Sequence, residues 1–100
     1  MNTMEVRIQA IHFDIAEKLT EFINKKVERI QRHFPDITSA DVILKVVKPE
    51  TAMNKEAVVE FTVPQQDKMV ATKTADSFEE AIDLCLEAVE RQLEKKKAKK

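Results

Sequence analysis

Residues 77–100 constrain the fold most, because their spacing predicts one long helix with a single apolar face. The larger apolar side chains recur every three or four positions, which places them on one stripe of an α-helix: Phe78, Ile82, Cys85, Leu86, Val89 and Leu93. Ser77, followed three positions later by Glu80, forms a capping-box pattern that is typical of a helix start. An amphipathic helix must bury its stripe, so the rest of the chain has to supply a second layer.

The charged residues of this helix are sorted by sign. At about 100° per residue, one flank of the apolar stripe carries an acidic row, Glu79, Asp83, Glu87, Glu90 and Glu94, and the other flank carries the C-terminal ribbon, Arg91, Lys95 and Lys99. We predict no acidic residue among the bases of the C-terminal ribbon. Two interpretations remain open, namely a solvated helix face and a surface that binds a polyanion.

A second amphipathic helix is predicted from Asp14, which forms a capping-box pattern with Glu17, to about Phe34, where Pro35 stops it. Its exposed side carries the N-terminal ribbon: Lys18, Lys25, Arg29 and Arg32. This ribbon lies on the same side of its apolar stripe as the C-terminal ribbon does. If the two helices pack side by side and parallel, we expect both ribbons to contribute to one solvent-facing surface.

The same helix face also has an ordinary interpretation. Glu21 precedes Lys25 by four positions, and Glu28 precedes Arg32 by four. Acid-before-base pairs at this spacing form surface salt bridges on a helix, each contributing a few tenths of a kcal/mol. The sequence therefore predicts these two salt bridges as the alternative to a binding role.

Four strands are predicted around the helices, over residues 4–11, 41–48, 57–63 and 68–75. The order β-α-β-β-β-α predicts an α+β fold, a four-stranded sheet with two roughly parallel helices packed on one face, as in double-stranded-RNA-binding domains. We expect a single domain over residues 1–100, with the basic tail from about residue 95 disordered.

The strand pattern assigns side chains to the two faces of the sheet. Val42, Leu44 and Val46 are expected to face the helices, which leaves Ile43 and Val47, with Val58, on the other face. A protein-interaction adaptor that uses this exposed apolar patch is one alternative function. Scattered surface apolar residues are common, however, so a solvated sheet face is the simpler interpretation.

The composition argues against an enzyme. The chain has no glycine, so it lacks phosphate-binding glycine loops and dinucleotide motifs. Its single cysteine, Cys85, lies on the apolar stripe and is expected to be a core residue. His12 and His33 have no neighbouring ligands at metal-binding spacing, and no nucleophile motif occurs. We therefore expect no catalytic residue, no cofactor and no metal.

The sequence also limits where the protein acts and what it binds. No apolar run is long enough to span a membrane, and no signal pattern opens the chain, so we expect a cytoplasmic protein without a membrane partner. The formal net charge is −1, so attraction to nucleic acid must come from local clusters. Because the chain has no Trp or Tyr, recognition of the RNA backbone by helix Lys and Arg is favoured over base stacking. The sequence contains no helix-turn-helix pattern, so we expect no binding to DNA.

The order of elements, together with residues 76–99, resembles the ribosome hibernation-promoting factor family, also called protein Y, ribosome-associated translation inhibitor or sigma-54 modulation protein. The first part of the family signature is matched by Asp76, Phe78, Ala81, Ile82 and Asp83, and the second part by Arg91, Gln92, Leu93, Lys95, Lys97 and Lys99. In the first predicted helix, Lys26, Arg29 and Phe34 fit the family pattern.

The resemblance implies a factor that binds the small ribosomal subunit in the channel of messenger and transfer RNA. There it would inhibit translation and preserve idle ribosomes under stress or in stationary phase. Because the sequence ends after the last helix, we expect a short form, which silences single ribosomes or needs a separate ribosome-dimerising factor to pair them. A general structured-RNA-binding module is the other alternative.

The RNA-binding residues predicted from the two basic ribbons and from the resemblance together are Lys25, Lys26, Arg29, Arg32, Arg91, Lys95, Lys97 and Lys99. Lys26 and Lys97 rest on the resemblance alone, because an ideal helix places them near an apolar stripe or the acidic row. Their long side chains can extend past such an edge.

Overall fold

The computed structural model describes residues 5–47, 52–64 and 68–98. Its elements follow the predicted order: β1 (Glu5–Ala10), α1 (Glu17–His33), β2 (Ser39–Val46), β3 (Lys55–Thr62), β4 (Met69–Ala75) and α2 (Phe78–Ala98). The strands form one sheet in the order β1-β2-β3-β4. β1 is parallel to β2, and β2, β3 and β4 form an antiparallel meander. This arrangement confirms the predicted α+β fold.

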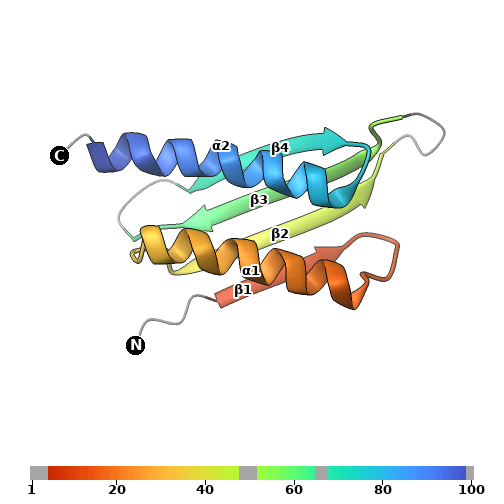
Figure 1. The fold of residues 1–100 in the computed structure, drawn as a ribbon, viewed down its shortest axis with the longest axis horizontal. Helices are drawn as coiled ribbons and strands as arrows, with labels where there is room; N and C mark the ends of the chain where they lie inside the picture. The colour runs from red at the N-terminus through yellow and green to blue at the C-terminus, as the bar shows by residue number, and fades with distance from the viewer. Residues whose placement is uncertain (1–4, 48–51, 65–67, 99–100) are drawn as a thin grey trace.

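Both helices cover the same face of the sheet and run in the same direction, α1 beside β1 and β2, and α2 beside β3 and β4 (Figure 1). The position of α1 on this face follows from the right-handed crossover that connects the parallel strands β1 and β2. The basic ends of the two helices therefore lie at one end of the molecule, and their acidic beginnings lie at the other.

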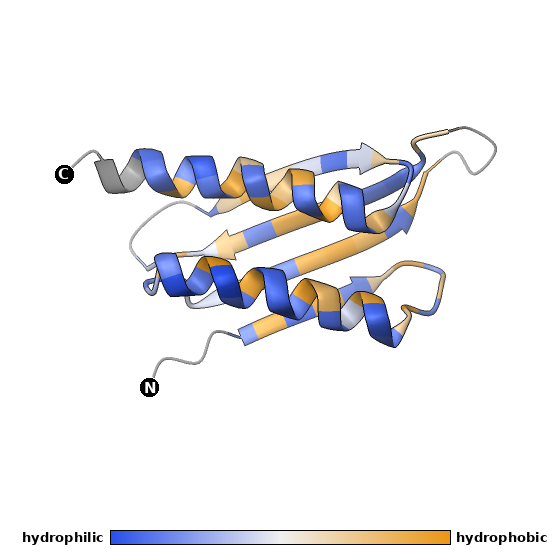
Figure 2. Ribbon diagram, in the orientation of Figure 1, coloured by the Kyte–Doolittle hydropathy of each residue, from blue (hydrophilic) through white to orange (hydrophobic). Residues whose placement is uncertain are grey.

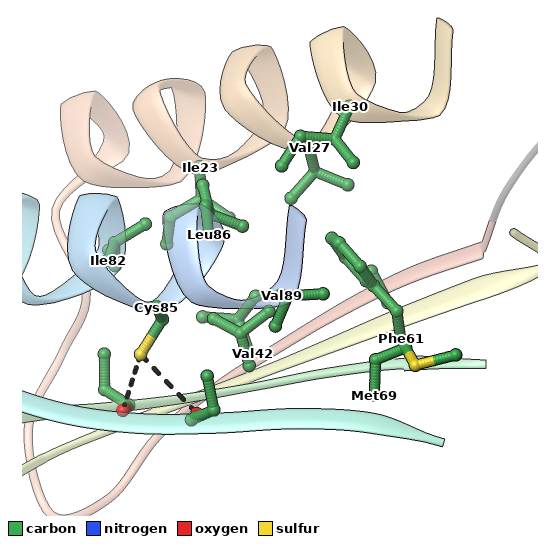
Figure 3. Close-up of a cluster of buried hydrophobic side chains, with 14 of the residues drawn as sticks. Ile23, Val27, Ile30, Val42, Phe61, Met69, Ile82, Cys85, Leu86 and Val89 are labelled. Carbon is green, nitrogen blue, oxygen red and sulfur yellow. Dashed lines mark hydrogen bonds between the residues drawn. The ribbon is translucent and has the colours of Figure 1, made fainter. Parts of the chain in front are cut away.

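The core fills the space between the helices and the sheet. Apolar colour is concentrated on the strands and on the helix sides that face them (Figure 2). Ile23 and Val27 of α1, Phe61 of β3, and Ile82 and Val89 of α2 are all completely buried (Figure 3). At roughly 1.5–3 kcal/mol for each fully buried large apolar side chain, this layer is the main source of stability.

Cys85 belongs to this core, as predicted. Its Sγ lies 3.1 Å from the carbonyl oxygen of Ala57 and 3.5 Å from that of Ala71 (Figure 3). The thiol shares its one hydrogen between these two acceptors. Burial raises the pKa of the thiol to about 11. A thiol with this pKa is almost entirely protonated near neutral pH, so Cys85 acts as a small core side chain.

The predicted start of the first helix was wrong. α1 begins at Glu17 with Ala16 as its N-cap, and no side chain caps it. The preceding segment has another role, because the ring of Phe13 stacks on that of Phe78 with 5.0 Å between centroids, and His12 adopts a positive φ of 64°. Asp14 therefore lies in a connection that reaches across to α2, and the helix starts after it.

The start of α2 is as predicted, because Ser77 Oγ accepts from the backbone N–H of Glu80 at 3.2 Å. The expectation of a disordered basic tail covers residues 95–98, which continue α2, and residues 99–100, which lie outside the described residues. The strands begin two residues earlier than predicted for β2 and β3. Val46, expected to face the helices, is 38% exposed, because it ends β2 beyond the cover of the helix layer.

Candidate nucleic-acid interface

The four bases of the N-terminal ribbon, Lys18, Lys25, Arg29 and Arg32, are all exposed on α1. Within the described residues, none of them has an acidic group within ion-pair distance. The predicted salt bridges Glu21–Lys25 and Glu28–Arg32 are therefore not formed. Exposed pairs of long side chains gain little in water, which is why spacing alone does not produce them. The ribbon thus presents four cations whose charge is not compensated by a neighbour.

Lys26 lies apart from this ribbon, between the two helices. Its Nζ lies 3.3 Å from Asp83 Oδ1 on α2 and 5.3 Å from the ring centroid of Phe22. The side chain is 37% exposed, so it is accessible only in part. Of the predicted RNA-binding residues on α1, Lys26 is the one that already holds an anionic partner.

Two contacts fix the rotation of α2 about its axis. Asp83 points toward α1, where it meets Lys26, and Gln92 Nε2 donates to the carbonyl oxygen of Val70 on β4 at 3.2 Å. At about 100° per residue, the side of Asp83 carries the acidic row and the side of Gln92 carries Lys95. The acidic row therefore faces α1, and the C-terminal ribbon faces away from it.

This rotation determines how the two ribbons are arranged on the solvent-facing side of the helices. The helices are side by side and parallel, as the expectation required, but the acidic row of α2 lies between the two ribbons. Parallel neighbours turn opposite flanks toward each other, so ribbons on equivalent flanks cannot meet at the helix–helix boundary. The helix face consequently has stripes of alternating charge.

Arg91 of the C-terminal ribbon is paired with the neighbouring acidic row of the same helix. Its Nη2 lies 3.3 Å from Glu87 Oε1, one helical turn earlier. Residues four positions apart are only about 40° apart around a helix, and that spacing could have revealed the pair from the sequence. Lys95 is exposed and, among the described residues, has no ion-pair partner. Lys97 lies in α2 without a described side chain, and Lys99 lies outside the described residues.

The outer sheet face, which points away from the helices, carries compensated charge. Arg7 forms a two-pronged contact with Asp41, at 2.6 Å and 3.1 Å, and also lies 3.4 Å from Glu5. The hydrogen bond from Arg7 lowers the pKa of the Asp41 carboxyl, and the same bond raises the pKa of Arg7. Two further ion pairs between described residues lie on this face, Lys45–Glu56 at 3.5 Å and Lys68–Glu60 at 3.3 Å.

The apolar patch predicted on the outer sheet face is smaller than expected. Ile43, Val47 and Val58 are each partly buried, and among the described residues of this face Val70 is the large apolar residue that is prominently exposed, at 43%. Gln9, Ile43, Val58 and Thr72 form one row across the four strands, so polar residues end the row at both edges. This face offers a protein partner little continuous apolar area.

The part of the chain that the structure describes contains no group of three or more His, Cys, Asp and Glu residues that could hold a metal ion. Nor does any described helix have the length and apolar character needed to cross a membrane.

Comparison with known proteins relates this geometry to ribosome-associated chains. A ribosome hibernation promoting factor from Azotobacter vinelandii is 32% identical over 96 residues, which cover 96% of this chain and 85% of the relative. One from Pseudomonas putida is 29% identical, with 96% and 89% covered. A ribosome hibernation promotion factor from Bacillus subtilis is 27% identical, and the match spans 50% of its length.

Solved structures share the fold. A ribosomal subunit interface protein from Coxiella burnetii superposes with a TM-score of 0.84 at 27% identity, with 96% of this chain and 100% of the other covered. The Protein Y N-terminal domain from Thermus thermophilus, at 17% identity, has the same fold with a TM-score of 0.76. The model of the sigma 54 modulation protein / S30EA ribosomal protein family matches residues 6–100. Since that match covers nearly the whole sequence, the chain belongs to this family.

Proposed function

We propose that this protein is a ribosome hibernation factor that binds the small ribosomal subunit in the decoding channel. There it blocks the path of messenger and transfer RNA, inhibits translation and preserves idle ribosomes in the cytoplasm. Membership of the family and the hibernation factors among its relatives support this role. The protein acts by occupying the channel and not by catalysis.

The contrast between the two faces of the domain carries the proposal. On the outer sheet face, the described bases Arg7, Lys45 and Lys68 all have carboxylate partners. On the helix face, the four bases of the N-terminal ribbon and Lys95 have none among the described residues. An uncompensated cation can bind a phosphate without first breaking an ion pair, so ribosomal RNA lies against the helices.

Co-sedimentation with purified small subunits tests this proposal. The wild-type protein is expected to pellet with the subunits, to dissociate steeply as salt is raised, and to remain bound in the presence of excess duplex RNA. The double variant Arg29→Glu/Lys95→Glu is expected to lose binding. The matched control Lys45→Glu/Lys68→Glu makes the same change in net charge on the outer sheet face and is expected to pellet like the wild type.

Circular dichroism of each variant establishes that it is folded before binding is measured. Absence of pelleting by the folded wild-type protein at low salt would contradict the proposal. Equal losses in both double variants would show that net charge, and not the helix face, governs binding. Displacement by duplex RNA would favour a general structured-RNA-binding module.

A further inference from the structure

Among the described side chains, two helix-face bases are paired, and both are held by the same acidic row. Asp83 holds Lys26 across the helix boundary, and Glu87 holds Arg91 along α2, each at 3.3 Å. All four side chains are accessible to solvent, with exposed fractions from 37% to 74%. Each carboxylate therefore takes the place that a phosphate would need in order to contact Lys26 or Arg91.

The position of the row matters as much as its pairs. It lies between the N-terminal ribbon and the C-terminal ribbon, so a nucleic acid that spans both ribbons must pass over it. Carboxylates on this path repel phosphates at distances within the Debye length, about 8 Å at physiological salt. A polyanion that touches only one ribbon gains few contacts and still experiences this repulsion. A ligand that presents phosphates to both ribbons gains contacts on each side of the row.

We propose that Asp83 and Glu87 are specificity-determining residues that weaken the binding of generic RNA duplexes, and thereby favour the ribosomal site. The inference deepens the proposed function and rests on it. In the absence of the matching RNA surface, the two carboxylates occupy Lys26 and Arg91. Binding to an RNA that fits both ribbons replaces these internal partners with phosphates, whereas an arbitrary duplex does so poorly.

The test compares two isosteric double variants that each raise the net charge by the same amount. Asp83→Asn/Glu87→Gln removes the two acids from the helix face. Glu56→Gln/Glu60→Gln removes two acids that hold lysines on the outer sheet face. Binding of a short fluorescent RNA duplex is followed by anisotropy at several salt concentrations.

The helix-face variant is expected to bind the duplex about three- to tenfold more tightly than the wild type, from the typical strength of exposed ion pairs. Its log–log salt dependence is expected to steepen by about one to two, because Lys26 and Arg91 become available to phosphates. The control is expected to change duplex affinity less than twofold. Equal gains in both variants, or no duplex binding by any of them, would overturn the inference.

A further variant separates electrostatic competition from a structural role of the ion pair. In the Lys26→Met background, Asp83 no longer has a cationic partner on α1. The affinity gain from Asp83→Asn is then expected to be smaller than in the wild-type background. An undiminished gain would contradict action through Lys26.

Subunit co-sedimentation by the same variants keeps this inference distinct from the proposed function. The ratio of duplex Kd to subunit Kd is expected to fall in Asp83→Asn/Glu87→Gln. Failure of the wild type to bind subunits, with a gain in duplex affinity retained, would reject the ribosomal role and leave the competition intact. Normal subunit binding with an unchanged ratio would reject the specificity role alone.

Discussion

The two faces of the sheet differ in the side chains they carry and in the environment of those side chains. The inner face buries apolar residues such as Val59 and Phe61 completely under the helices. The outer face stays in water and pairs its charges across strands, as Arg7 does with Asp41. On the outer face the bases Arg7, Lys45 and Lys68 have carboxylate partners. The four bases of the N-terminal ribbon and Lys95, which lie on the helices, have none among the described residues. The layer that stabilises the fold therefore also presents the candidate interface.

The largest expected effect comes from breaking the inner face. Phe61→Ala in β3 should destabilise the domain by about 3–5 kcal/mol, because it removes a fully buried ring and leaves a cavity. Val58→Ala, three positions earlier on the partly exposed outer face, should cost about 1 kcal/mol or less. Urea unfolding of both variants measures the difference. Similar losses at the two positions would contradict the assignment of the faces.

The second prediction, of intermediate size, concerns the reactivity of Cys85, which α2 buries against the inner face of the sheet. With a thiol pKa raised from 9.0 to about 11, Cys85 should have about a hundredfold less thiolate than an unperturbed cysteine near neutral pH. Modification by a thiol reagent at pH 8 should therefore be slow in the native protein and fast in denaturant. Rapid native labelling would show that α2 opens away from the sheet more readily than its packing implies.

The smallest expected effect lies on the outer face. The pKa of Asp41 is lowered by its hydrogen bond from Arg7, so the carboxylate stabilises the fold above its unfolded-state pKa, near 4. That contribution is lost as the pH falls below this value and through the lower native pKa. Asp41→Asn should lower Tm by about 1–5 °C at pH 7, because an exposed ion pair contributes only modestly to stability.

The difference in Tm between wild type and Asp41→Asn should then shrink as the pH is lowered from 5 toward 2. Thermal melts followed by circular dichroism across this range provide the measurement. A difference that stays constant with pH would show that the Asn side chain acts through packing or hydrogen bonding and not through the lost charge.

The fold could be predicted from the sequence because it depends on periodicity. The stripes of both helices, the strand order and the cap at Ser77 all follow from local patterns. The start of α1 could not be predicted in this way, because Phe13 stacks on Phe78, a residue 65 positions away in the sequence. A capping pattern at Asp14 is a local signal, and a tertiary contact overrode it.

The candidate site was predictable only in part, for the same physical reason. Which residues lie on one helix flank follows from about 100° per residue, and the exposed Arg29 and Lys95 lie where the ribbons required. Which flank faces the neighbouring helix depends on packing. The tertiary contacts of Asp83 with Lys26 and of Gln92 with the Val70 carbonyl reveal that the acidic row separates the ribbons. Whether these bases bind RNA remains a prediction.

The contact from Gln92 to the Val70 carbonyl has a consequence for self-association. β4 is the last strand of the sheet, and a strand in this position offers unpaired backbone groups on which another chain can add a strand. Gln92 takes one of these acceptors, and the exposed Lys73 places a charge on the same strand. A second molecule that paired along β4 would have to displace the amide and desolvate the lysine. Through Gln92, helix α2 thus hinders the addition of a strand at this point of the sheet edge.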